Sequence, residues 1–157
     1  MKLHGSFLFL FVPMDIKTIT MLKHKASALW KGKGVDGQGT ISTASKVLDK
    51  TKFTYKARVG EEGGTTPEEL IAAAHAGCFA MKLAYTFDMA GYTAESLEVD
   101  CTVDFEGAVI TGSHLKLRAK VPGISKEEFN ELVTDSGHNC PVSLMMKTEV
   151  TVESALV

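Results

Sequence analysis

The chain has 157 residues, a length that fits one domain. Apolar residues make up 45% of it and charged residues 23%, which is enough apolar material for a hydrophobic core. The net charge of −2 gives no electrostatic basis for binding nucleic acid or an anionic membrane, so we expect neither partner. Three cysteines do not make a disulfide-rich secreted pattern, and we expect a reducing, cytoplasmic location.

Residues 1–20 are predicted to be an N-terminal extension of unclear role, and residues 21–157 to form the domain. The apolar run at 7–12 is too short to span a bilayer, which takes about 20 residues. Pro13-Met14-Asp15 follows this run where a signal peptide would carry a small-residue cleavage site. We therefore expect neither a membrane span nor a cleaved leader here.

The next segments read as strands. Loose alternation at 24–31 and a glycine-rich turn at 33–39 predict a hairpin into residues 40–43. Residues 53–59 then alternate between apolar and polar side chains. This period of two predicts a half-buried strand that carries Arg58 on its polar side.

A long helix follows, and its start has a clear mechanism. Thr66 can cap the helix, Pro67 suits its first turn, and Glu69 can close a capping box. We expect the helix to reach about Ala90, with Gly91 supplying a left-handed exit. Its middle is apolar on nearly every side, which predicts a buried helix. Because so small a domain cannot cover it alone, we predict a partner subunit.

The remaining elements complete an α+β fold. Apolar and acidic residues alternate at 97–105, and apolar and basic residues alternate at 115–121, which favours antiparallel pairing of two strands. A second capping box predicts a helix over 125–137 that ends at its glycine. A short helical turn from Pro141 and a last strand at 148–153 follow.

Two cysteines occupy positions where a thiol can be made reactive, although each can equally be a packing residue. Cys78 lies in the middle of the long helix, where burial raises a thiol's pKa, so a reactive Cys78 needs a nearby cation. Cys140 precedes Pro141 and is predicted to cap the short helix, where the backbone favours a thiolate. Cys101 belongs to an apolar strand face and is predicted to be structural.

A zinc site is the alternative use of these cysteines. His75 and Cys78 share one helix face, and His138 and Cys140 offer two more ligands. Two cysteines and two histidines can bind zinc, but this spacing is not that of a zinc finger.

From the residues alone, Arg58 is interpreted as a solvated strand residue. Glu68 is interpreted as an acid in the first turn of the helix, where it complements the helix dipole. Glu68 is free to reach elsewhere because Glu69 can serve the cap. Glu68 and Cys78 lie about 15 Å apart along one helix, so Glu68 should not touch Cys78 of its own chain. If both serve one site, a second chain supplies one of them.

Four linked segments resemble the OsmC/Ohr family of peroxide reductases, and the OsmC branch above all. The resemblance covers about residues 24–153, in the same order and at similar spacing. The segments are Thr66-Pro67-Glu68-Glu69-Leu70, Ala74-His75-Ala76-Gly77-Cys78-Phe79-Ala80-Met81, Val121-Pro122-Gly123-Ile124 and Cys140-Pro141-Val142-Ser143.

This resemblance implies an intertwined homodimer in which antiparallel sheets wrap long buried central helices and the active sites lie between subunits. It makes Cys78 the peroxide-attacking cysteine and Cys140 the resolving cysteine, with Arg58 and Glu68 completing the catalytic set. The implied activity is thiol-dependent reduction of organic hydroperoxides, and more weakly of hydrogen peroxide, through a Cys78 sulfenic acid and a Cys78–Cys140 disulfide. An external thiol such as a dihydrolipoyl group would reduce the disulfide, with no cofactor or metal.

The match departs from the family pattern in small ways. Gly77 precedes Cys78 where a bulkier small residue is common, and His138-Asn139 precedes Cys140. Local electrostatics favours Cys140 as the more acidic thiol, whereas the family pattern makes Cys78 the attacker. We follow the family pattern, because Arg58 can supply the missing charge. The alternative is a non-peroxidase relative that binds an apolar ligand or zinc.

Overall fold

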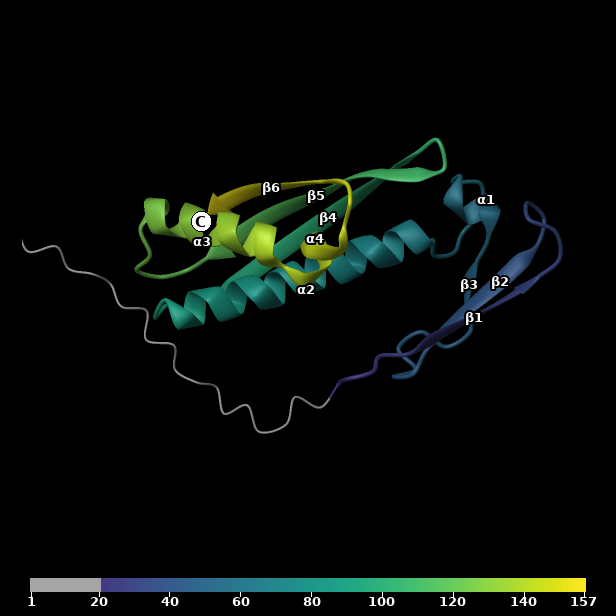
Figure 1. Cartoon of the computed structure of the whole chain (residues 1–157), viewed down its shortest axis with the longest axis horizontal. Coiled ribbons are helices and arrows are strands. Elements are labelled where there is room, and N and C mark those ends of the chain that lie inside the picture. The colour runs from purple at the N-terminus through teal and green to yellow at the C-terminus, as the bar shows by residue number, and fades with distance from the viewer. Residues whose placement is uncertain (1–20) are drawn as a thin grey trace, which may run out of the picture.

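The computed structural model describes residues 21–157, and the predicted extension at 1–20 lies outside them. The described residues form two three-stranded sheets and a long helix (Figure 1). The N-terminal sheet has the order β1-β2-β3, and the C-terminal sheet has the order β4-β5-β6. The elements are β1 (Ala26–Lys31), β2 (Gln38–Thr43), β3 (Thr51–Phe53), α1 (Tyr55–Arg58), α2 (Pro67–Met89), β4 (Ser96–Glu106), β5 (Val109–Lys120), α3 (Lys126–Asn139), α4 (Pro141–Met145) and β6 (Glu149–Leu156).

The predicted α+β fold and the predicted ends of the long helix α2 are confirmed. The Thr66 hydroxyl accepts a hydrogen bond from the backbone N–H of Glu69 at 3.0 Å, and Pro67 occupies the first turn. At the other end Gly91 has a φ of +87°, the left-handed conformation that glycine adopts without strain.

The predicted pairing of β4 with β5 is also confirmed. The two strands run antiparallel with Glu98 opposite Arg118 and Asp100 opposite Lys116, so acidic and basic side chains face each other on one surface. The chain then crosses through α3 and α4, and β6 pairs parallel with β5.

The predicted strand over 53–59 is wrong, because sheet pairing ends at Phe53. Thr54 caps the short helix α1: its hydroxyl accepts a hydrogen bond from the Ala57 N–H at 2.9 Å and donates one to Glu62. A hydroxyl that caps a helix thus overrides the alternating pattern. Arg58 consequently lies at the end of a helical turn and not on a strand.

The predicted end of the second helix at Gly137 is also wrong, because α3 continues to Asn139. Gly137 is buried against β6, and a Cβ at this position would come within 2.8 Å of the Val152 side chain. This glycine therefore permits close packing of α3 on β6 and does not end the helix.

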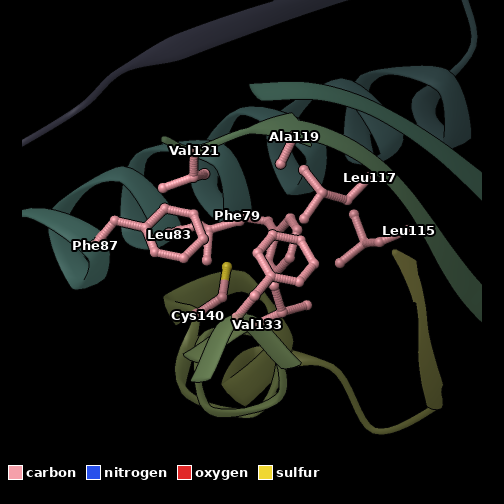
Figure 2. Close-up of a cluster of buried hydrophobic side chains, with 10 residues drawn as sticks. Phe79, Leu83, Phe87, Leu115, Leu117, Ala119, Val121, Val133 and Cys140 are labelled. Atoms are coloured by element: carbon pink, nitrogen blue, oxygen red, sulfur yellow. The ribbon is translucent and has the colours of Figure 1, made fainter. Parts of the chain in front are cut away.

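The hydrophobic core lies between α2, β5 and α3 (Figure 2). Only one face of α2 contributes to it, through residues spaced four apart: His75, Phe79, Leu83 and Phe87. The opposite face is exposed in the single chain and consists mainly of small and apolar residues: Ala73, Ala74, Gly77, Met81, Ala84, Tyr85 and Met89. The length and apolar composition of α2 would suffice for a membrane-spanning helix. The core helices of soluble proteins meet the same two criteria.

Candidate active site

The fold brings together Cys78, from the middle of α2, and Cys140, from the junction of α3 and α4. Both are free thiols, with Cys78 half-buried and Cys140 fully buried. Figure 2 shows the Cys140 sulfur pointing from the α3–α4 junction toward the core side chains that line α2. The Cys140 thiol and the backbone N–H of Val142 both lie near enough to the Cys78 thiol to shift its pKa. Two thiols from distant parts of the chain are therefore neighbours.

The surroundings of Cys78 do not by themselves make it a thiolate. Burial raises the pKa of Cys78, and the adjacent Cys140 thiol raises it further. The N–H of Val142 lowers that pKa, but this effect is smaller than that of burial. Within one chain Cys78 is accordingly a protonated thiol near pH 7, and no cation of the described residues is among the groups that shift its pKa.

Arg58 and Glu68 form a two-point ion pair between α1 and the start of α2. Arg58 Nη2 lies 3.1 Å from Glu68 Oε1, and Arg58 Nε lies 3.1 Å from Glu68 Oε2. The guanidinium also lies 5.0 Å from the ring centroid of Phe105, in cation–π geometry. Because two parallel hydrogen bonds fix the plane of a guanidinium, Glu68 holds Arg58 in one orientation.

These two pairs are apart within one chain. Glu68 occupies the first turn of α2, and the helix rise places Cys78 about 15 Å further along the axis. Arg58, which is bound to Glu68, shares this separation. The four predicted site residues thus form two half-sites in a single chain: a cationic half at one end of α2 and a thiol half at its middle.

A cleft of about 170 Å³ adjoins the cationic half-site. Aromatic side chains dominate its walls, and the Arg58 guanidinium adds a positive charge; the lining residues are Trp30, Gly34, Phe53, Thr54, Tyr55, Arg58 and Pro67. Trp30 and Phe53 pack together with ring centroids 5.5 Å apart. The cleft can accept an apolar group that carries a polar or anionic end.

His75 has a role that the sequence did not indicate. It is completely buried, with Nδ1 2.7 Å from the Ser113 hydroxyl and Nε2 2.9 Å from the Ser143 hydroxyl. Burial lowers the pKa of His75, so the ring is neutral near pH 7. Residues 21–157 contain no group of three or more histidine, cysteine or acidic side chains placed to hold a metal ion.

Cys101 lies beside the buried polar cluster that His75, Ser113 and Ser143 form. Its sulfur lies 3.4 Å from the Ser113 hydroxyl, and burial raises the pKa of its thiol. Cys101 packs against the core and remains protonated, in agreement with the structural role expected from its strand face.

Comparison with known proteins places this chain in a family. Residues 60–155 match the family model described as OsmC-like protein. The chain is 38% identical to peroxiredoxin OsmC of Escherichia coli over an alignment of 136 residues. This alignment covers 84% of this chain and 95% of the relative. It is 32% identical over 124 residues to an organic hydroperoxide resistance protein of Xanthomonas axonopodis, covering 76% and 86% of the two chains. These two relatives are peroxidase-type enzymes by name.

Solved structures show the same fold. The OsmC-like protein of Mycoplasma pneumoniae superimposes with a TM-score of 0.70 at 14% identity, covering 88% of this chain and 99% of the other. The organic hydroperoxide resistance protein OhrB of Bacillus subtilis superimposes with a TM-score of 0.60 at 23% identity, covering 85% and 98%. The chain belongs to the OsmC family.

Proposed function

We propose that this protein is a thiol peroxidase that reduces organic hydroperoxides, and more weakly hydrogen peroxide. The observation that carries the proposal is that the Cys78 and Cys140 thiols, which come from distant parts of the chain, lie near enough for Cys140 to shift the pKa of Cys78. The names of its relatives, peroxiredoxin OsmC and organic hydroperoxide resistance protein, support the same chemistry.

The proposed reaction has two steps on the protein. The Cys78 thiolate attacks the terminal oxygen of the hydroperoxide, the O–O bond breaks, and the departing alkoxide takes a proton and leaves as alcohol. The Cys140 thiolate then attacks the Cys78 sulfenic sulfur, and the hydroxyl leaves as water after taking a proton. An external dithiol, with a dihydrolipoyl group as our candidate, reduces the Cys78–Cys140 disulfide.

Each complete site in this proposal is shared by two chains. Arg58 cannot reach Cys78 of its own chain, because it is tied to Glu68 at the far end of α2. In a homodimer the partner can bring its own Arg58–Glu68 pair to this Cys78. A guanidinium beside the sulfur lowers the thiol pKa and opposes the effects of burial and of Cys140.

The exposed apolar surfaces give a physical reason for two copies of the chain to form a dimer. One face of α2 is unpaired in the single chain, and Met81, Tyr85 and Met89 on it are more than half exposed. Gly77 lies on the same face with no atom near its Cβ position, so another backbone can approach closely there. Every residue of β1 is exposed as well. Burial of these surfaces against a second copy follows from the hydrophobic effect.

The cleft beside Arg58 suits an organic hydroperoxide. Its aromatic walls can bind an alkyl or aryl group, while the guanidinium can hold the peroxide oxygens. Hydrogen peroxide has no apolar group to fill the cleft, which is why we expect weaker reaction with it. We place the enzyme in the cytoplasm, where a reducing environment regenerates the thiols.

Single-turnover reaction with cumene hydroperoxide tests this proposal. We expect one equivalent of peroxide to be consumed per chain, with the loss of two free thiols and two hydrogens in the intact mass. Cys140→Ser should stop at the Cys78 sulfenic acid, and Cys78→Ser should be inert. Equal peroxide consumption by Cys78→Ser would overturn the proposal. Stoichiometric zinc in native mass spectra, with unreactive thiols, would favour a binding module instead.

A further inference from the structure

The buried imidazole of His75 connects the helix of the attacking cysteine to the segment that carries the resolving cysteine. Its Nε2 lies 2.9 Å from the hydroxyl of Ser143 on α4, and its Nδ1 lies 2.7 Å from the hydroxyl of Ser113 on β5. His75 is one helical turn before Cys78, and Ser143 is three residues after Cys140. The hydrogen bond between His75 and Ser143 therefore joins the two segments whose cysteines must react.

α4 has few other means of staying in place. It spans Pro141–Met145, and Ser143 is its only residue with a hydrogen-bonding side chain. Leu144 and Met145 are 68% and 73% exposed, so they add little packing in the single chain. Only the buried Cys140 and the partly buried Val142 pack against the core. No side chain caps α4 at Cys140.

His75 is suited to hold this segment because it cannot easily turn away. Its side chain has no exposed surface, and both ring nitrogens are engaged. A neutral imidazole donates one hydrogen bond and accepts another, and each serine hydroxyl can take either role, so the cluster is satisfied in both tautomers. A fully satisfied buried cluster has one preferred geometry.

We propose that His75 is a positioning residue that holds α4 through Ser143, and thereby sets the rate at which Cys140 closes the disulfide with Cys78. Disulfide formation requires Cα atoms within about 7 Å and a specific approach of one sulfur to the other. If α4 loses its hydrogen bond to His75, Cys140 samples more positions and fewer of them are productive. This inference rests on the proposed function, in which Cys140 resolves a Cys78 sulfenic acid.

A matched pair of variants separates this role from general stability. Ser143→Ala and Ser113→Ala each remove one hydroxyl and leave one buried nitrogen of His75 without its partner. Only Ser143→Ala releases α4, because Ser113 lies on β5 and its removal leaves the bond from His75 to Ser143 intact. Ser143→Thr keeps a hydroxyl on α4 and serves as the conservative control.

The measurement follows each full-length dimer after a stoichiometric dose of cumene hydroperoxide, with rapid alkylation and intact mass at each time. We expect Ser143→Ala to form the disulfide about 10- to 100-fold more slowly than wild type, while the sulfenic acid accumulates. Ser113→Ala and Ser143→Thr should close the disulfide at nearly the wild-type rate. Equal rates in Ser143→Ala and wild type, or equal slowing in both alanine variants, would overturn the proposal.

A second oxidant distinguishes this inference from the proposed function. Diamide takes two electrons from the thiol pair without peroxide chemistry: one thiolate adds to its N=N bond, and the other thiolate then attacks that sulfur and displaces the hydrazine. The rate of this second step reports how well the two sulfurs meet. Slow closure of Ser143→Ala with diamide supports the role of His75 even if wild type fails to consume peroxide, a failure that would overturn the peroxidase proposal alone. Normal closure with diamide would overturn the role of His75.

One further readout is specific to the position of α4. In addition to burial, the Cys140 thiol raises the pKa of Cys78, and the backbone N–H of Val142 on α4 lowers that pKa by a smaller amount. Release of α4 loosens both neighbours, so the pH midpoint for alkylation of Cys78 should shift downward in Ser143→Ala and stay unchanged in Ser113→Ala. A loss of stability without movement of α4 would leave this midpoint in place, and so an unmoved midpoint counts against the proposal.

Discussion

The two halves of the chain differ in how much of their own surface they bury. From α2 to β6 the chain covers a core of its own, in which Phe79, Leu83 and Phe87 have no exposed surface. The N-terminal sheet is separate from the C-terminal sheet, and all six residues of β1 are exposed (Figure 1). Its main internal packing is Trp30 on Phe53. The C-terminal half thus has a complete core of its own, although one face of α2 stays exposed, whereas the N-terminal sheet has little core and needs another surface to cover it.

The predicted site residues divide along the same line. Cys78 and Cys140 belong to the complete half, whereas Arg58 follows the exposed sheet and reaches the beginning of α2 and the Phe105 ring on β4. The thiol pair lies at the core of a single chain, with Cys140 in the core and Cys78 packed against it. In our proposal, the positive charge that activates these thiols is that of Arg58, which belongs to the N-terminal half that needs a covering surface. Assembly and activity are then linked, because the contact that covers the N-terminal half also completes the site.

The largest effect should follow from a charge on the exposed face of α2. Met81→Glu would place a carboxylate against the partner, and an unpaired buried charge costs about 3–5 kcal/mol. We expect dissociation to monomers and loss of peroxide reduction, measured by analytical ultracentrifugation and single-turnover assay. Asn130→Glu adds the same charge on the exposed side of α3 and should leave the dimer intact. A fully active Met81→Glu monomer would break the link between assembly and activity.

Loss of Arg58 should be the next largest effect. Arg58→Ala removes the cation proposed to stabilise the thiolate and the developing charge, and should slow the first step about 10²- to 10³-fold. Lys56→Ala removes an exposed cation from the same helix and should react normally. The rate of peroxide consumption in a single turnover measures both.

Mixed dimers sharpen this prediction, because they show which chain supplies the arginine. A hybrid of Cys78→Ser and Arg58→Ala chains retains one intact site if Arg58 serves the partner's cysteine. Such hybrids should recover about half of the wild-type activity per dimer, although each parent is inactive. An inactive hybrid would show instead that Arg58 serves its own chain.

The pH dependence of Cys78 should shift in a direction set by its neighbours. Burial and Cys140 both raise the pKa of Cys78, and in the dimer the proposed cation opposes them. Arg58→Ala should therefore move the pH midpoint for alkylation of Cys78 upward by about one to three units, and reaction at neutral pH should slow because less thiolate is present. Cys140→Ala removes a neighbour that raises this pKa and should move the midpoint downward. Iodoacetamide labelling across pH measures both shifts.

Local signals were sufficient for the elements that depend on neighbours in sequence. The cap at Thr66 and the exit at Gly91 act within a few residues, so the sequence located both ends of α2. The alternation at 53–59 gave a wrong strand, because a cap at Thr54 outweighed it. Gly137 was misread as a helix end because its reason, the approach of Val152, lies on a strand that follows it in sequence.

The sequence proposed the members of the candidate site but did not indicate the residues that support them. The family resemblance assigned Cys78, Cys140, Glu68 and Arg58, of which all but Arg58 lie in the four quoted segments, and the helix rise already separated Glu68 from Cys78. The role of His75 was missed because its serine partners lie 38 and 68 residues away along the chain. Beside Cys78 its spacing looked like part of a zinc site, and only the folded chain shows both of its nitrogens occupied by hydroxyls.

The smallest effect should come from loss of Arg118, which lies on the outer face of the C-terminal sheet. Arg118 pairs with Glu98 across β4 and β5 at 3.7 Å, with both side chains well exposed to solvent. Water and salt screen such a pair, so Arg118→Ala should lower the free energy of unfolding by less than about 1 kcal/mol in urea titrations. Peroxide consumption should be unchanged. A loss of activity comparable to that of Arg58→Ala would mean that the outer face of the C-terminal sheet takes part in the reaction, and the division of the site proposed here would not hold.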